Sequence, residues 1–162
     1  MLVWRALAAD PMPMEWGPTN CGAVMALALD KPGYEIKTNQ PVNLAMCVKN
    51  VSNGIVYLED TSEVRDFSFV VISPSNTDIS PHHPEDDGFH YRDITRSLKP
   101  DGYINYAYTL SSICSFTQIG TYKVTARRKA IGGCEITSNE LKIVVVPGEW
   151  KSDPADAPRK GF

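Results

Sequence analysis

The segment IGTYKVTARRK, residues 119–129, carries the clearest indication of the fold. Its apolar and polar residues alternate, which places Tyr122, Val124 and Ala126 on the inward face of a strand. A glycine turn followed two residues later by an inward tyrosine is typical of a tyrosine corner, in which the phenol bonds to backbone a few residues upstream. The alternative is a simple core tyrosine. The tyrosine corner favours a β-sandwich over an up-and-down barrel.

Strand-like patterning recurs along most of the chain. Turn residues such as Asn53-Gly54 and Gly132-Gly133 separate the runs, and no window shows apolar residues at helical spacing. The other apolar or alternating runs are residues 23–30, 40–52, 55–59, 66–73, 101–110 and 139–148. The sequence therefore predicts an all-β fold, an antiparallel immunoglobulin-like β-sandwich of about seven strands.

The length of 162 residues suits one domain with tails. We expect an N-terminal extension over 1–20, a sandwich over 21–147 and a disordered tail over 148–162, where proline and charge are frequent. Ala6 and Ala8 have the small-residue spacing of a signal-peptidase site, but the apolar run before them is short. A signal remnant and an ordinary frayed terminus both remain open.

Charge and hydrophobicity exclude two classes of partner. The formal net charge of −3 and the pI of about 5.6 argue against a general nucleic-acid binder, which would be basic. No apolar run is long enough to span a bilayer. We expect neither a nucleic-acid partner nor a membrane span.

The stretch SPHHPEDDGFHYRD, residues 80–93, gathers all three histidines beside three acids. Adjacent histidines on an extended chain point opposite ways, and the spacing matches neither a zinc motif nor an EF-hand loop. We expect a solvated loop that contacts a protein partner, with a metal or small-ligand site as the alternative, and no cofactor. The candidate contact residues are His82, His83, Glu85, Asp86, Asp87 and His90.

A second candidate surface is basic. Arg127, Arg128 and Lys129 end the strand that begins at Gly120, and Lys123 shares the outward face of Arg127. These charges have two interpretations: they keep an exposed sheet soluble, or they contact a negatively charged partner. Arg127 and Arg128 are the candidate partner-binding residues.

Nothing in the sequence forms a catalytic set. No GxSxG motif is present, and Cys114 suits a buried or disulfide-bonded cysteine better than a nucleophile. We therefore expect no enzyme. Asn50 begins a formal glycosylation sequon, Asn-Val-Ser, which matters only in a eukaryotic secreted protein.

Two stretches resemble bacterial immunoglobulin-like domains. YEIKTNQPVNLAMCVKNVS, residues 34–52, is similar to their A–B region, and SLKPDGYINYAYTLSSICSFTQIGTYKVTARR, residues 97–128, to their E–F region. Similar sequence patterns occur in sandwich domains attached to some secreted peptidases and, more loosely, in proteinase-inhibitor domains. The chain departs from the pattern at TNQPV, where Gly-Glu is usual, so that turn is built differently.

The resemblance implies a non-catalytic module for protein–protein interaction or structural support, exported or on the cell envelope. A secreted or periplasmic location follows, with the cytoplasm left open. The alternative is an inhibitor-like domain acting through end loops such as residues 74–96. Edge strands also allow a dimer.

Immunoglobulin strand order bears on the four cysteines, which lack zinc-site spacing. That order brings Cys21 and Cys134 to one pole, so this pair is the favoured disulfide, with Cys47 to Cys134 as the second choice. Cys47 has outward parity on its strand, which does not match the inter-sheet bridge of antibody domains.

Overall fold

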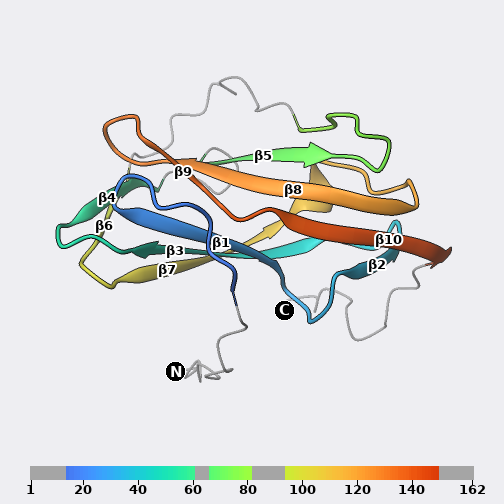
Figure 1. Cartoon of the computed structure of the whole chain (residues 1–162), viewed down its shortest axis with the longest axis horizontal. Helices are drawn as coiled ribbons and strands as arrows, with labels where there is room; N and C mark the ends of the chain where they lie inside the picture. The colour runs from blue at the N-terminus through green and yellow to red at the C-terminus, as the bar shows by residue number, and fades with distance from the viewer. Residues whose placement is uncertain (1–13, 61–65, 82–93, 150–162) are drawn as a thin grey trace, which may run out of the picture.

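The computed structural model describes residues 14–60, 66–81 and 94–149. These residues form ten strands and one 3-10 turn, η1 (Leu110–Ser112) (Figure 1). The strands are β1 (Ala23–Leu29), β2 (Glu35–Thr38), β3 (Asn43–Asn50), β4 (Val56–Glu59), β5 (Phe67–Ile72), β6 (Thr95–Leu98), β7 (Tyr103–Thr109), β8 (Gly120–Lys129), β9 (Glu135–Thr137) and β10 (Leu141–Glu149).

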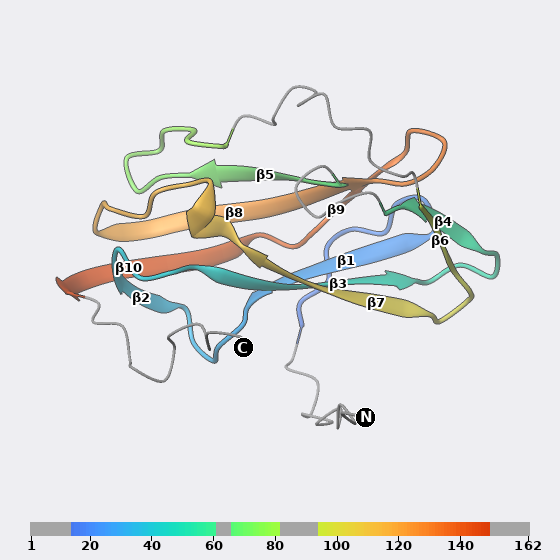
Figure 2. The ribbon, with the colours of Figure 1, turned by 180° about the vertical axis from the view of Figure 1, so that it is seen from behind.

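The strands form two main layers. One sheet has the order β1-β3-β7, and the other has the order β2-β10-β8-β5 with β9 beside β8. All these ladders are antiparallel except β2 with β10, which is parallel. Strands β4 and β6 form a small third sheet at one end. Both ribbon views show β5, β8 and β9 in the layer opposite β1, β3 and β7 (Figures 1 and 2).

Side chains from both layers meet in one core. The ring centroids of Phe69 on β5 and Tyr108 on β7 lie 4.9 Å apart, and those of Phe67 and Tyr106 lie 5.0 Å apart. All four residues lie on the inward side of the alternation in their strands. The all-β class and the antiparallel sandwich are confirmed.

The strand count was too low. Each of the seven predicted runs contains a strand, but β2, β6 and β9 were missed. They have only three or four residues, which gives alternation little to act on. The equally short β4 was predicted because it follows the Asn53-Gly54 turn. The predicted turn at Gly132-Gly133 joins β8 to β9, with φ angles of 97° and 81°. That region of φ suits glycine.

Residues before β1 also belong to the folded part. Trp16 forms a bridge with Ala26 on β1, and the N–H of Gly17 donates to the carbonyl of Met25 at 2.9 Å. At the other end β10 continues to Glu149. Within the described ranges, no helix has the length and apolar character needed to cross a membrane.

Candidate interaction surface

The outer side of the five-stranded sheet is rich in lysine and arginine. Alternation turns these side chains away from the core, and strand pairing brings them together from three strands. We call this surface the basic face. Its charged residues are Lys37 on β2, Lys123, Arg127 and Lys129 on β8, and Lys142 on β10, with Glu35 on β2 and Glu135 on β9.

Charge on the basic face is unevenly compensated. Near the β8–β9 hairpin, Arg127 lies 3.7 Å from the Glu135 carboxylate, and Lys129 pairs with Glu135 in register. Further along, Lys123 lies directly opposite Lys142. Like charges in opposite positions of a sheet destabilise it. Five basic residues against two acidic ones give the face a net charge of +3, although the whole chain carries −3.

Apolar residues lie between these charges. Val70 and Ile72 on β5 and Val144 and Val146 on β10 have outward parity and are only partly buried. The aliphatic stems of lysine side chains extend such apolar surface. The basic face can therefore make both charged and apolar contacts.

Arg128 does not belong to this surface. It was predicted to be exposed together with Arg127, but its side chain is 1% exposed and lies inside the sandwich. Its guanidinium carbon is 4.7 Å from the centroid of the Phe67 ring and 4.7 Å from that of Tyr106. As a partner-binding surface residue, Arg128 was wrongly predicted.

Alternation explains the burial of Arg128. It lies two residues after Ala126, which was already predicted to point inward, so continuing the pattern places Arg128 in the core as well. The signal was therefore present, but the charge suggested a surface position. Arg127 has the opposite parity and is exposed, as expected.

Several groups compensate the buried charge. Nη2 of Arg128 donates to the carbonyl of Glu59 and lies 3.6 Å from the Asp60 carboxylate and 3.8 Å from that of Asp66. Asp60 also accepts from Nε of Arg96 at 2.6 Å. Cations stack favourably on aromatic rings, so the rings of Phe67 and Tyr106 supplement the ion pairs.

The Arg128 environment leaves some polar atoms unpaired. Nε and Nη1 of Arg128 and the hydroxyl of Tyr106 have no hydrogen-bond partner among the residues that the structure describes. Burial raises the pKa of Tyr106 to about 12, and the nearby positive charge of Arg128 opposes this shift. The phenol therefore stays neutral, and the cluster is suited to holding the two sheets together.

The histidine-rich loop remains a prediction. His82, His83, Glu85, Asp86, Asp87 and His90 all lie outside the described residues. In the described portion of the chain, no three metal-binding side chains gather at one point. A hollow of about 410 Å³ beside the β1–β2 turn has mixed apolar and polar walls, and its polar residues include Asp30, Glu35, Gln40 and Asn43.

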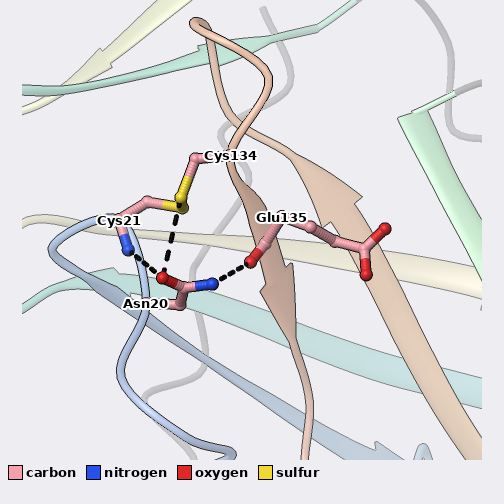
Figure 3. The surroundings of a disulfide bond; sticks show 4 residues. All are labelled: Asn20, Cys21, Cys134 and Glu135. Atoms are coloured by element: carbon pink, nitrogen blue, oxygen red, sulfur yellow. Dashed lines mark hydrogen bonds between the residues drawn. A yellow bond between two sulfur atoms is a disulfide. The ribbon is translucent and has the colours of Figure 1, made fainter.

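The disulfide joins Cys21 to Cys134, the pair favoured from the sequence (Figure 3). Their Cα atoms are 6.0 Å apart. Asn20 supports this pole, because its side-chain oxygen accepts from the N–H of Cys21 at 3.0 Å and its amide donates to the carbonyl of Glu135 at 2.7 Å. The second choice, Cys47 with Cys134, does not form.

The other two cysteines are free and buried. Desolvation raises the pKa of the Cys47 and Cys114 thiols, although nearby Lys49 and the backbone N–H of Ser115, respectively, oppose it. Neither thiol is therefore readily ionised. Alternation along β3 places Cys47 on the outward face, yet its side chain is buried. Its position in the alternation therefore did not predict whether it is exposed.

Two polar residues have structural contacts. The hydroxyl of Tyr122 accepts from the backbone N–H of Gln118 at 2.9 Å, four residues upstream. Asn50, the first residue of the sequon, is fully buried, and its amide donates to the carbonyls of Gly54 and Leu98 at 2.7 and 2.8 Å. In the folded protein this amide is inaccessible to glycosylation.

Comparisons with known proteins assign no family. No known family matches the chain, and neither does any curated protein. Among solved structures, a β-glucosidase from Listeria innocua is 8% identical with a TM-score of 0.42, and the match covers 78% of this chain but 16% of that one. The sporulation control protein from Bacillus subtilis is 14% identical with a TM-score of 0.46, covering 76% and 49%.

A third similar structure is the CARDB domain of a Pyrococcus furiosus protein in complex with di-metal ions. It is 16% identical with a TM-score of 0.38, and the match covers 80% of this chain and 94% of that one. TM-scores this low carry no argument about activity, ligand or partner. A function for this chain must therefore be inferred from its own surface.

Proposed function

We propose that this protein is a non-catalytic, immunoglobulin-like module whose basic face binds an acidic surface of another protein. The observation that carries the proposal is the direct opposition of Lys123 and Lys142 on neighbouring strands. Such a pair is unfavourable in the free protein, and a carboxylate-rich partner removes the repulsion.

A protein partner suits the basic face better than a nucleic acid. The chain as a whole is negatively charged, so beyond the face it repels a polyanion. The partly buried Val70, Val144 and Val146 offer apolar contact between the charges. Protein interfaces combine an apolar centre with a charged rim in this way.

The absence of catalysis is part of the proposal. The buried Cys114 thiol, with its raised pKa, supports a structural cysteine over a nucleophile. The Cys21–Cys134 disulfide supports an oxidising compartment, as expected for an exported protein. We interpret the hydrogen bond between Tyr122 and Gln118 as a tyrosine corner, which supports the immunoglobulin-like assignment.

Charge reversal on the basic face tests the proposed function. The full chain, immobilised as bait, is incubated with an extract of its source, and the captured proteins are purified for affinity measurements. We expect Lys123→Glu with Lys142→Glu to weaken binding of the acidic partner by at least about tenfold, because two attractive contacts become repulsive. Added salt should weaken the wild-type complex as well.

The matched control is Lys31→Glu with Lys99→Glu. Both lysines are exposed, and neither lies on the basic face, so the change in net charge is the same. The control should keep the wild-type affinity. Equal affinities of both double variants for the purified partner would exclude the basic face as the binding surface.

A further inference from the structure

Among the described residues, strand β7 has a hydrogen-bonding edge with no strand beside it, although the Thr109 carbonyl at its end accepts from the Ser112 hydroxyl at 2.7 Å. On its other side it pairs with β3, where the N–H of Leu110 donates to the carbonyl of Val42 at 2.8 Å and the N–H of Asn50 to the carbonyl of Gly102 at 2.9 Å. Even-numbered residues of this segment therefore point their backbone groups toward β3. In an antiparallel ladder, the backbone N–H and C=O groups of successive residues point alternately toward and away from the neighbouring strand. The odd-numbered residues of β7 therefore point their backbone groups away from β3.

The edges of the other long strands are covered. Beside β1, the Asn139 side chain bonds both the N–H and the carbonyl of Leu27, at 2.7 and 3.0 Å. Beside β5, the N–H of Ile79 donates to the carbonyl of Val71 at 2.9 Å, and the N–H of Val71 donates to the Ser80 hydroxyl, also at 2.9 Å.

Strand β7 lacks the usual protection of an edge. It is seven residues long, contains neither proline nor a charged residue, and has no further strand beside it in the described part of the chain. Strand β6, by contrast, has four residues and carries Arg96. Long, uncharged edges readily accept another strand.

We propose that β7 pairs antiparallel with β7 of a second copy of this chain, about a two-fold axis at Tyr106. The sheet β1-β3-β7 then continues through the axis into its symmetry mate. Asn105 faces Ala107 of the second copy, and Tyr103 faces Thr109. Each pairing occurs twice, and together they make about eight inter-chain hydrogen bonds between outward-facing backbone groups. Two of these bonds are made to the Thr109 carbonyls, which also accept from the Ser112 hydroxyls.

Charge and side-chain pairing favour a second copy as the occupant. With no charged residue on the strand, two copies oppose no like charges along it. On the inner side Ile104 faces Tyr108, a β-branched residue opposite an aromatic one, which is a favourable cross-strand pair. On the outer side the exposed Tyr103 faces the smaller Thr109 of the second copy, so these two side chains fit beside each other without a steric clash.

The dimer leaves the basic face free, because that face belongs to the other sheet. Each dimer therefore presents two copies of the surface that we propose for binding. Two linked sites raise the apparent affinity for a partner that is itself multivalent. The dimer is independent of the proposed function, because its test measures the molecular mass of the protein and involves no binding partner.

Sedimentation equilibrium of the full chain, from about 1 to about 100 μM, tests the dimer. We expect the wild type to approach twice its mass of 17.9 kDa. Ala107→Pro removes one outward N–H and leaves the ladder with β3 intact, and proline is tolerated on strand edges. Asn105→Lys with Ala107→Lys places like charges across the axis. Both variants should sediment as monomers.

The control is Ser97→Lys, at an exposed position on β6. It should remain dimeric, and the double-lysine variant should keep the wild-type circular dichroism spectrum, which shows that it is folded. Its melting temperature should be lower, because the wild type is stabilised by association of folded chains. A wild type that stays monomeric throughout the concentration range would overturn the proposal. A dimer that survives both β7 changes would also overturn it, because the contact would then lie elsewhere.

Discussion

Arg128 is the residue at which charge and position conflict most strongly. A guanidinium removed from water loses several kcal/mol of hydration, which its new contacts must offset. Here it packs against two adjacent aromatic rings and near two carboxylates, with a backbone carbonyl as acceptor. These contacts come from both layers of the sandwich, so Arg128 links them.

We predict that Arg128→Ala lowers the free energy of unfolding by about 3 kcal/mol, because it removes the ring contacts and leaves Asp60 and Asp66 without their buried counterion. Urea denaturation measures the loss. The matched control is Arg127→Ala on the same strand, whose exposed side chain should matter by only about 0.5 kcal/mol. If Arg128→Ala lowered the free energy of unfolding no more than Arg127→Ala does, the buried contacts of Arg128 would contribute no stability.

Tyr106 makes the same region sensitive to alkaline pH. Its pKa is raised to about 12 in the folded protein, whereas an unfolded tyrosine titrates near pH 10. The folded state therefore holds the phenolic proton more tightly, and the contribution to stability is complete below about pH 10. It is lost as the pH rises through about 12.

We predict that the free energy of unfolding decreases between about pH 10 and 12, and that Tyr106→Phe makes this decrease shallower. Denaturation curves at successive pH values measure both slopes. Tyr57→Phe, which changes an exposed phenol, is the control and should keep the wild-type slope. If the Tyr106 variant also keeps it, another group is responsible.

At the scale of elements, edge protection distinguishes the strands. Asn139 uses its side-chain amide like a short piece of strand, bonding both backbone groups of Leu27 on β1. Strand β7 has no strand beside its outer edge among the described residues, and the Ser112 hydroxyl bonds only to the Thr109 carbonyl at its end. One side of the β1-β3-β7 sheet is thus closed within the chain, and the other is left for a partner strand.

We predict that Asn139→Ala lowers the free energy of unfolding by about 1–3 kcal/mol, because two partly buried backbone groups of Leu27 lose their partner. Hydrogen exchange should show faster exchange of the Leu27 amide. Glu140→Ala, at the exposed neighbouring position, is the control. Unchanged protection of Leu27 in the Asn139 variant would contradict the assigned role.

For the whole molecule, the disulfide closes a long loop. Cys21 and Cys134 are 113 residues apart, so the bridge restricts most of the unfolded chain. Closing a loop of this length lowers the entropy of the unfolded chain, which stabilises the folded state by about 4 to 5 kcal/mol. The bridge also holds the β8–β9 hairpin end near the start of β1 (Figure 3).

We predict that Cys21→Ser with Cys134→Ser lowers the free energy of unfolding by about 4 kcal/mol. Reduction of the wild type by dithiothreitol should give the same loss, measured by guanidinium denaturation. Dithiothreitol should leave the double variant unchanged, because Cys47 and Cys114 are already free thiols. A wild-type midpoint in the double variant would show that the disulfide contributes little to stability.

Local patterning was enough to predict seven of the strands that the structure describes, the inward residues of β8 and the sandwich. Alternation needs only a few neighbouring residues, so Tyr122, Val124 and Ala126 could be assigned to the core from the sequence alone. The same rule places Arg128 there, although its charge obscured this. Short strands such as β2 and β9 offered too few residues for the pattern.

The surfaces depend instead on pairing between distant segments. Lys123 and Lys142 become opposite neighbours only because β10 lies beside β8, and Lys37 joins them only because β2 pairs with β10. Likewise, the open edge of β7 follows from its place at the end of a sheet. Alternation is a property of adjacent residues, whereas strand order and register arise from long-range packing. That packing created the basic face and the open edge, and with them the binding sites proposed for this protein.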